Sequence, residues 1–243
     1  MILAAGLGTR LRPLTDRLPK PLLPIAGRPM IEYTLGWVAA AGIRDVMINL
    51  HHKGELIQEA LGTGERFGMT ISYSEEPVIL GTGGGLKRVE GFFKDEPFLI
   101  VNADVLTALD PNDLIRTHAA HRPLATLAVR RDPATATYGA LGVDAAGRIR
   151  RFLGRGVASE ALEDVMFTGL HVLDPRVLAA IPVDHFSPIT DEYIAIVERG
   201  EPLMGHRSDA TWIDIGTPER YQEAQQLVAR GDIPLWSARL GSR

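Results

Sequence analysis

The first half of the chain alternates short apolar runs with stretches whose apolar residues recur at helical spacing. In MIEYTLGWVAAA, for example, Ile31, Leu35 and Val38 fall on one helical face, and Gly42 follows as a stop. Runs such as DVMINL and PFLIVN are typical of buried strands. The pattern predicts strands at Asp45–Leu50, Met69–Tyr73, Pro97–Asn102 and Leu124–Arg130, helices at Met30–Ala41, Gly54–Leu61 and Gly83–Val89, and a further helix opened by Asp110 and Pro111.

The second half of the chain has a different pattern of apolar and polar positions. Two strands joined by DAAG predict a hairpin, and a longer apolar run follows it. The predicted elements are the hairpin strands Tyr138–Val143 and Arg148–Phe152, the strands Val165–Leu173 and Thr211–Ile215, and the helices Pro175–Ile181, Ile189–Glu198 and Thr217–Ala229. We therefore expect an α/β fold with a doubly wound, mostly parallel mixed sheet and a small C-terminal lobe, all in one domain over residues 1–243.

Composition narrows the functional classes. With 45% hydrophobic residues the chain can bury a sizeable core, and its net charge of −4 provides no basic field for nucleic acid. The absence of cysteine excludes disulfides, thiolate metal sites and cysteine nucleophiles. We see no membrane span or signal peptide and expect a cytoplasmic protein. Because Met1-Ile2-Leu3 is short for a central strand, we also expect that a few residues precede Met1.

The stretch LAAGLGTRLRPLTDRLPKPLLPIAG combines bare backbone with positive charge directly after the first strand. It matches neither the dinucleotide pattern G-x-G-x-x-G nor the Walker pattern, and GTGGGLK further on does not match the Walker pattern either. A plain strand-to-helix turn explains Gly6 and Gly8 but leaves Arg10, Arg12 and Lys20 unexplained. Ligands of open α/β sheets bind beyond the carboxyl ends of the strands, and bare backbone at that edge lets N–H groups approach an anion.

Taken together, LAAGLGTRLRPLT and PKPLLPIAG resemble the signature of the sugar-1-phosphate nucleotidyltransferases. The resemblance continues through LGTGGGLKRVEGFF, VNADVL, FTGLHVL and WIDIGTPERYQEA and so covers nearly the whole chain. It implies a Rossmann-like domain that joins a nucleoside triphosphate to a sugar 1-phosphate, releases pyrophosphate and requires Mg²⁺. Residues 1–131 would then form the nucleotide-binding half, and residues 132–243 the sugar-binding half with the second metal ligand.

The resemblance also implies a set of site residues. Arg10 would hold the departing pyrophosphate, and Lys20 would contact the phosphates at the reacting centre. Further nucleotide-binding positions would be Leu3, Ala4, Ala5, Gly6, Gly8, Thr9, Glu76, Gly81 and Thr82. The sugar phosphate would be bound by Asn102, Gly139, Arg155, Thr168 and Gly169, and the metal by Asp104 and Asp214.

Each of these assignments has a simpler alternative. Arg10 could form an ordinary surface ion pair, Asp104 could cap a strand end, and Asp214 could be an acid near a helix N-terminus. The sugar side also departs from the family, because Gly154-Arg155-Gly156 stands where many relatives carry Glu-Lys-Pro. Arg155 could still grip a phosphate in bidentate fashion, whereas the contacts of the missing glutamate with sugar hydroxyls have no replacement.

The identity of the nucleotide base is predicted from Glu76. Its two carboxylate oxygens could accept from the adjacent N1–H and N2–H donors of guanine, whereas uracil offers one donor between two acceptors. The chain also looks most similar to mannose-1-phosphate guanylyltransferases, so we expect GTP with mannose 1-phosphate. A uridylyltransferase acting on N-acetylmuramate 1-phosphate or another hexose 1-phosphate is the alternative.

Two other classes of function fit less well. A nicotinamide-dependent oxidoreductase would need the missing dinucleotide fingerprint. A non-catalytic nucleotide sensor would have little reason to retain Arg10, Lys20, Asp104 and Asp214 together. The sequence leaves a homo-oligomer open.

Overall fold

The computed structural model describes residues 1–133, 135, 139–157, 159 and 161–236. The chain divides into two compact units that are interleaved along the sequence. Unit 1 consists of Met1–Ile79, Val101–Asn112 and the residues from Ala210 onward. Unit 2 consists of Leu80–Ile100 and Asp113–Asp209. Within the described residues, no helix is long and apolar enough to cross a bilayer.

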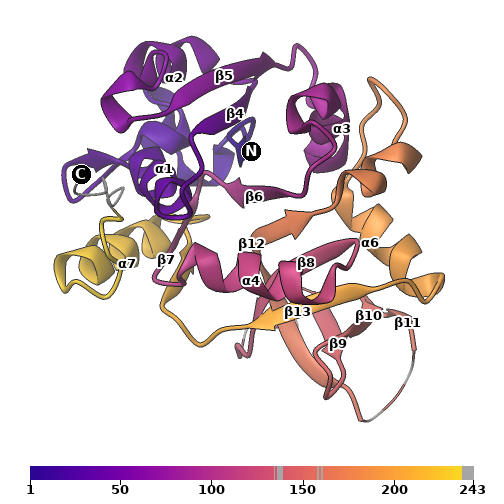
Figure 1. Cartoon of the computed structure of the whole chain (residues 1–243). Coiled ribbons are helices and arrows are strands. Elements are labelled where there is room, and N and C mark those ends of the chain that lie inside the picture. The colour runs from indigo at the N-terminus through magenta and orange to yellow at the C-terminus, as the bar shows by residue number, and fades with distance from the viewer. Residues whose placement is uncertain (134, 136–138, 158, 160, 237–243) are drawn as a thin grey trace, which may run out of the picture. The chain divides into compact units, whose positions relative to one another are not determined.

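Unit 1 contains a parallel sheet built by strand–helix–strand connections (Figure 1). Strand β1 (Ile2–Leu3) pairs with β4 (Asp45–Leu50) on one side and with the end of β6 (Phe98–Asn102) on the other. Strand β5 (Thr70–Glu75) pairs with β4. The connections carry helices α1 (Met30–Ala40) and α2 (Gly54–Leu61). This parallel order brings the carboxyl ends of the strands to one edge.

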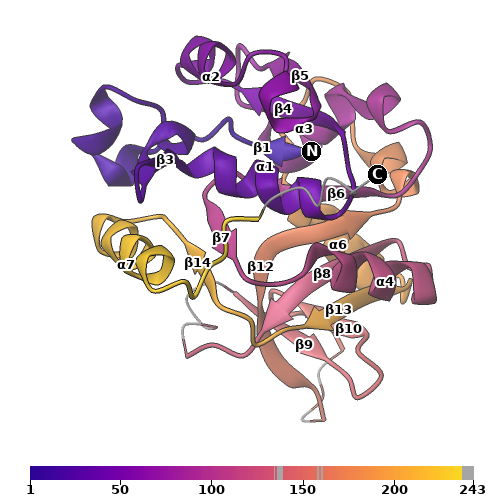
Figure 2. The ribbon, with the colours of Figure 1, turned by 60° about the vertical axis from the view of Figure 1, so that its left-hand side comes forward.

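A second part of unit 1 surrounds an antiparallel pair, β7 (Val105–Thr107) and β14 (Trp212–Asp214), which is followed by helix α7 (Pro218–Ala229) (Figure 2). The chain between β1 and α1 forms three short 3₁₀ turns and a hairpin. The turns are η1 (Thr9–Leu11), η2 (Leu14–Asp16) and η3 (Lys20–Leu22), and the hairpin strands are β2 (Pro24–Ile25) and β3 (Arg28–Pro29).

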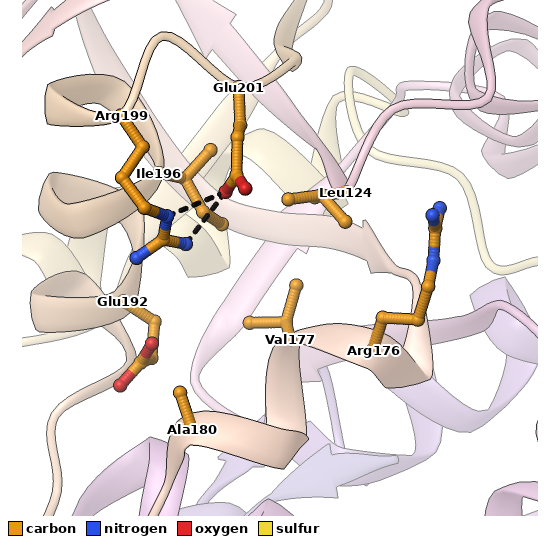
Figure 3. A pocket seen from close by; sticks show the side chains of 8 residues that line it. All are labelled: Leu124, Arg176, Val177, Ala180, Glu192, Ile196, Arg199 and Glu201. Carbon is orange, nitrogen blue, oxygen red and sulfur yellow. Dashed lines mark hydrogen bonds and ion pairs between the residues drawn. The ribbon is translucent and has the colours of Figure 1, made fainter.

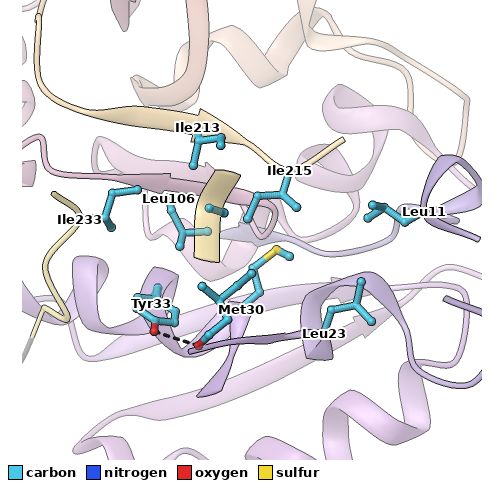
Figure 4. Close-up of a cluster of buried hydrophobic side chains, with 10 residues drawn as sticks. Leu11, Leu23, Met30, Tyr33, Leu106, Ile213, Ile215 and Ile233 are labelled. Carbon is cyan, nitrogen blue, oxygen red and sulfur yellow. Dashed lines mark hydrogen bonds between the residues drawn. The ribbon is translucent and has the colours of Figure 1, made fainter. Parts of the chain in front are cut away.

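One buried cluster joins these segments of unit 1 (Figure 4). Its members come from the segment between β1 and α1, from α1, from β7, from β14 and the residue after it, and from α7 and the segment after it: Leu11, Leu23, Ile25, Met30, Tyr33, Leu106, Ile213, Ile215, Ala224 and Ile233. Helix α7 is tied to the hairpin as well, because the hydroxyl of Tyr221 and the amide of Gln225 both donate to the backbone oxygen of Pro24. Residues far apart in sequence therefore share one apolar core beneath the glycine loop.

Unit 2 is built on a mixed sheet (Figure 1). Its long strand β12 (Glu163–Leu173) runs antiparallel to β8 (Ala125–Arg130) and to β9 (Ala140–Val143). The sheet continues from β9 into β10 (Ile149–Phe152) and β11 (Arg155–Gly156), while β13 (Leu203–Arg207) runs parallel to β8. Helical segments of this unit are α3 (Gly81–Arg88), α6 (Ile189–Glu198), most of α4 (Pro111–His121), and the 3₁₀ turns η5 (Glu90–Phe93) and η6 (Pro175–Ala180).

The expected fold class, a mostly parallel mixed sheet with flanking helices, is confirmed. Asp45–Leu50, Gly54–Leu61 and Ile189–Glu198 have the predicted bounds. Strands β7 and β13 were not predicted, and the predicted helix from Pro175 is a 3₁₀ turn. The predicted hairpin is present from Ala140 to Phe152, whereas Tyr138 lies outside the described residues.

Candidate functional site

The glycine loop leaves β1 at the carboxyl edge of the parallel sheet. Gly8 has a φ of 64°, and a Cβ built on it would lie 3.1 Å from Thr15 Cγ2 and 3.2 Å from Lys20 Cβ. Glycine is thus required there by both conformation and space. Gly6 is different, because it is exposed and a Cβ on it would meet nothing within 4 Å. Open backbone at Gly6 leaves room for a ligand to approach.

Two side chains hold the loop in this shape. The hydroxyl of Thr15, which is buried, donates to the backbone oxygen of Gly8 at 2.9 Å. Lys53 Nζ donates to the backbone oxygens of Asp16 at 2.6 Å and Thr15 at 3.3 Å. Neither Thr15 nor Lys53 was predicted from the sequence. Both donate to the main chain, so the loop geometry is set before any ligand arrives.

One predicted metal ligand ends a strand, and the other directly precedes the strand that pairs with it. Asp214 ends β14 opposite Val105 of β7, and Asp104 immediately precedes β7. The backbone N–H of Ile215 donates to the backbone oxygen of Asp104 at 2.9 Å. Lys20 forms an ion pair with the carboxylate of Asp104, and the lysine side chain is only 11% exposed. The structure thus brings together three residues that are distant in sequence.

Asp214 carries the most unusual electrostatics of this group. Its Oδ1 is buried and has no hydrogen-bond partner within the described part of the chain. Burial, and then the nearby charge of Asp104, raise the pKa of the Asp214 carboxyl, while Lys20, Arg220 and Arg10 partly offset that rise. An orphaned buried carboxylate oxygen is uncommon and calls for a cationic partner.

The guanidinium of Arg10 lies near the carboxylate of Asp214. A Cβ built on the buried Gly216 would lie 3.2 Å from Nη2 of Arg10 and 3.3 Å from Oδ1 of Asp214. The guanidinium and the carboxylate therefore both border this one glycine. Unit 1 thus gathers Arg10, Lys20, Asp104 and Asp214, with two cations and two carboxylates beside the glycine loop; their roles stay predictions.

The residues present fit Mg²⁺ better than a transition metal. No group of three or more histidine, cysteine or acidic side chains is arranged to hold a metal within residues 1–133, 135, 139–157, 159 and 161–236. Mg²⁺ needs no such cage, because it takes one or two carboxylates together with water and substrate phosphates. The orphaned oxygen of Asp214 and the adjacent Asp104 provide such a pair of carboxylates.

Arg220 of helix α7 binds the backbone of Asp214. Arg220 Nε donates to the backbone oxygen of Asp214 at 2.6 Å, and its guanidinium carbon lies 5.6 Å from the ring centroid of Trp212. Thr217 caps the helix by accepting from the backbone N–H of Arg220. Arg220 lies inside the motif WIDIGTPERYQEA, but its position in the motif gave no signal of this contact.

Glu76, predicted to read the base, is almost completely buried at 2% exposure. Its Oε1 accepts from Asn49 Nδ2 at 2.8 Å, and Asn49 Oδ1 accepts from the backbone N–H of Ala4 at 2.9 Å. His51 Nδ1 lies 2.6 Å from the backbone oxygen of Glu76. Direct contact of Glu76 with a base stays a prediction. Asn49 was not predicted; a polar residue near the end of a buried strand is the signal that could have identified it.

The second glycine stretch lies in unit 2 at the start of α3. Its glycines pack against the backbone of residues 185–187 of the same unit. A Cβ on Gly84 would lie 2.3 Å from the oxygen of His185, and one on Gly81 or Gly83 would lie 2.9 or 2.8 Å from the oxygen of Ser187. This close approach is one reason for the glycines. The predicted contacts of Gly81 and Thr82 with the nucleotide stay predictions.

The predicted sugar-phosphate residues fall in both units, with Asn102 at the end of β6 in unit 1 and the others in unit 2. Arg155 forms an ion pair with Glu198 of α6, and its side chain is 65% exposed. The hydroxyl of Thr168 donates to the backbone oxygen of Ala128 within the sheet. Gly169 has a φ of 82° where the register of β12 with β8 shifts.

Gly139 has a φ of 92°, in the left-handed region that favours glycine, whereas a Cβ there would meet only the end of the exposed Leu153 side chain, which can move aside. These residues thus have structural roles inside unit 2, and their contacts with a sugar stay predictions.

Unit 2 also contains a cavity of about 250 Å³ between η6 and α6 (Figure 3). Its apolar lining is Leu124, Val177, Ala180 and Ile196, and its charged lining is Arg176, Glu192, Arg199 and Glu201. Arg199 is already held by two hydrogen bonds to Glu201. None of the residues predicted for the site lines this cavity.

Comparison with known proteins gives a consistent result. The family model described as "Nucleotidyl transferase" matches residues 1–231. The chain is 33% identical to a UTP–glucose-1-phosphate uridylyltransferase of Synechocystis, over 95% of this chain and 63% of that protein. It is 32% identical to a mannose-1-phosphate guanylyltransferase of Mycobacterium tuberculosis, over 96% of this chain and 65% of that protein. It therefore spans less than two thirds of the length of either relative.

A third relative matches over nearly its full length. The N-acetylmuramate alpha-1-phosphate uridylyltransferase of Neisseria meningitidis is 34% identical, over 94% of this chain and 97% of that protein. Among solved structures, the UTP-bound UGPase from Acinetobacter baumannii has a TM-score of 0.77 at 18% identity, covering 97% of this chain and 94% of that one. HddC from Yersinia pseudotuberculosis has a TM-score of 0.76 at 24% identity, covering 93% and 97%. These two structures support the fold alone.

Proposed function

The chain belongs to the nucleotidyl transferase family, and from that membership we propose that it joins a nucleoside triphosphate to a sugar 1-phosphate. A phosphate oxygen of the sugar 1-phosphate forms a bond to the α-phosphorus. The bond from that phosphorus to the oxygen bridging to the β-phosphate breaks, and pyrophosphate leaves. The observation that carries the proposal is the convergence of Arg10, Lys20, Asp104 and Asp214 beside the glycine loop of unit 1.

The proposed roles follow from the charge of the reactants. Two polyanions must meet in line, so catalysis depends mostly on positioning and on neutralisation of charge. Lys20 is held by Asp104 on a segment flanked by prolines, and it contacts the phosphates at the reacting centre. Arg10 binds the departing pyrophosphate, as the family resemblance implies. Gly6, Gly8 and Thr9 wrap the triphosphate with their backbone.

Mg²⁺ is the proposed cofactor, with Asp104 and Asp214 as its ligands. When bound, it neutralises phosphate charge that the two cations alone do not balance. The orphaned Oδ1 of Asp214 and the absence of a histidine or cysteine cage in the described residues support this choice.

The finer proposal is GTP with mannose 1-phosphate. The mannose-1-phosphate guanylyltransferase of M. tuberculosis among the relatives supports it. The Neisseria relative favours a second candidate, UTP with N-acetylmuramate 1-phosphate, because its length matches this chain. The Synechocystis relative likewise favours UTP, with a hexose 1-phosphate.

A matrix of pyrophosphate release tests the reaction and the substrates together. Four nucleoside triphosphates are combined with mannose, glucose, N-acetylglucosamine and N-acetylmuramate 1-phosphates in the presence of Mg²⁺. We expect release that depends on both substrates and is fastest with GTP and mannose 1-phosphate. Release in no combination contradicts the reaction, whereas a UTP maximum replaces only the finer proposal.

Glu76→Gln tests how the base is selected. The side chain of glutamine keeps an oxygen that can accept from Asn49 but loses one of two acceptors. If the carboxylate reads guanine, the variant loses its preference for GTP over UTP in kcat/KM while its Tm changes little. Unchanged selectivity excludes Glu76 as the residue that reads the base.

A further inference from the structure

A buried chain of hydrogen bonds crosses the ends of the parallel strands in unit 1. Asn49 of β4 is 3% exposed, and Glu76, directly after β5, is 2% exposed. The carboxamide of Asn49 accepts from the backbone N–H of Ala4, directly after β1, and donates to the carboxylate of Glu76. Three consecutive strand ends are therefore joined through one side chain at the edge where open α/β sheets bind ligands.

The chemistry of the partners fixes the orientation of this carboxamide. The N–H of Ala4 can only donate, so the oxygen of Asn49 must face it. A carboxylate accepts, so the nitrogen must face Glu76. Rotating the amide by half a turn would place donor against donor and acceptor against acceptor. Among side chains of this size, only asparagine satisfies both neighbours.

Glu76 is held from a second direction as well. Its backbone N–H donates to the oxygen of Leu50 at 2.7 Å, which extends the pairing of β4 with β5 by one residue. His51 Nδ1 contacts the backbone oxygen of Glu76 and must carry the proton there, because a carbonyl only accepts. The side chain and both main-chain polar groups of Glu76 are thus bound to β4 and the residue that follows it.

We propose that Asn49 is a positioning residue that couples the phosphate-binding and base-binding parts of the nucleotide site. Ala4 begins the glycine loop, whose backbone is the proposed phosphate cradle, and Glu76 lies in the segment assigned to the base. Asn49 contacts neither ligand part; it fixes the direction in which the loop leaves β1 relative to that segment. The inference rests on the proposed function only in taking the ligand to be a nucleoside triphosphate.

An exchange of donor and acceptor tests this role. Asn49→Asp places a carboxyl group against Glu76 and removes the donor between them. Asn49→Asp combined with Glu76→Gln restores the hydrogen bond in reverse, because the amide of the new glutamine donates to the new aspartate while Ala4 keeps its acceptor. The single variant should weaken binding by about tenfold, as expected when one buried polar pair is left unsatisfied. Because Glu76→Gln alone can change the contact with the base, the double variant is compared with Glu76→Gln, and the two should bind within about threefold of each other.

The measurement is the Kd of GTP and of UTP by calorimetry without sugar phosphate, so that it does not depend on turnover. Where turnover is present, KM for the triphosphate should rise in Asn49→Asp and KM for the sugar 1-phosphate should not. Tyr33→Phe is the matched control, because it removes another buried hydrogen bond of unit 1, from Tyr33 to the oxygen of Ile25. It should lower Tm without changing either Kd.

The outcomes separate the proposal from its alternatives. A double variant that binds about tenfold more weakly than Glu76→Gln, or an Asn49→Asp variant that loses only Tm as Tyr33→Phe does, overturns the coupling role. If Asn49→Asp does not fold, a folded double variant whose Kd is raised above that of Glu76→Gln overturns it, and one with the Kd of Glu76→Gln supports it. Nucleotide binding that follows this pattern in a protein without transferase activity contradicts the proposed function and leaves the coupling intact.

Discussion

The two units place similar ion pairs in opposite environments. In unit 1, Lys20 pairs with Asp104 and its side chain is only 11% exposed. In unit 2, Arg155 pairs with Glu198, and their side chains are 65% and 40% exposed. An exposed ion pair contributes about 0–1 kcal/mol to folding stability, whereas the groups packed around a largely buried cation fix its position.

The contrast indicates how the proposed reaction divides between the units. Phosphate groups are the same in every substrate of this class, so a cation held in place, as Lys20 is, can serve them. Sugars differ between substrates, and the predicted sugar residues either lie exposed, as Arg155 does, or have polar groups already bonded within their own sheet, as Thr168 does. We therefore expect substitutions at the phosphate side of unit 1 to act on rate, and those at the sugar side of unit 2 to act on sugar affinity.

The largest effect is expected at the two aspartates. Asp104→Asn and Asp214→Asn keep size and remove charge, so kcat should fall by at least about 10³-fold while Tm changes by a few degrees. Removing divalent metal with EDTA should abolish activity in the parent, and added Mg²⁺ should restore it. Near-full turnover of Asp214→Asn at saturating Mg²⁺ would show that the assignment of two carboxylate ligands is wrong.

The next largest loss of activity is expected at the two cationic side chains. Lys20→Ala and Arg10→Ala should each lose about 10²–10³-fold in kcat/KM, the usual cost of removing one preorganised donor that stabilises charge. Both directions of the reaction are measured, with both substrates varied. A loss below about tenfold for either variant returns that residue to an ordinary ion pair.

A good part of this picture follows from the sequence. The fold class and the bounds of β4, α2 and α6 follow from apolar runs bounded by glycine, proline or polar residues. Strand β13 was missed because LMGHR is short and half polar, and β7 because only two residues separate it from β6. Hydrophobic periodicity gives little signal over so few residues.

The candidate site was likewise predicted only in part. Arg10, Lys20, Asp104 and Asp214 stand in motifs, and the structure brings them together. Asn49 was missed because its role depends on the three-dimensional meeting of Ala4 and Glu76, which are 72 positions apart in the sequence. Patterns along the chain report which face a residue occupies but not which distant polar group it meets.

Lowering the pH should destabilise unit 2 more than unit 1. His171 of β12 is fully buried beside the hydroxyl of Tyr193, and burial lowers the pKa of its imidazole to about 3. The folded pKa lies below the unfolded one, so this contribution to stability is full above about pH 6.5 and falls as the pH drops toward 3. Between pH 7 and pH 5 the free energy of unfolding should decrease by about 2 kcal/mol on this account.

Denaturant unfolding at the two pH values measures that decrease, and hydrogen exchange locates it. Amides of β12 and β8 should lose protection before those of β4. His171→Gln cannot become charged, so its unfolding free energy should vary less between pH 7 and pH 5 than that of the parent. Equal pH dependence in the variant and the parent would exclude His171 as the cause.

The smallest effect is expected at Arg155, where the comparison between the units is most easily broken. Because its pair with Glu198 is exposed, Arg155→Ala should change the free energy of unfolding by less than about 1 kcal/mol. If the guanidinium also grips the sugar phosphate, KM for the sugar 1-phosphate should rise by about three- to tenfold, with KM for the triphosphate unchanged. Arg155→Lys keeps the charge but not the bidentate geometry, so it should recover only part of the loss. Glu198→Gln is the control, since it breaks the ion pair and leaves Arg155 in place. A rise in KM of equal size in Glu198→Gln and Arg155→Ala would assign the effect to the ion pair, and an unchanged KM in Arg155→Ala would remove Arg155 from the sugar site.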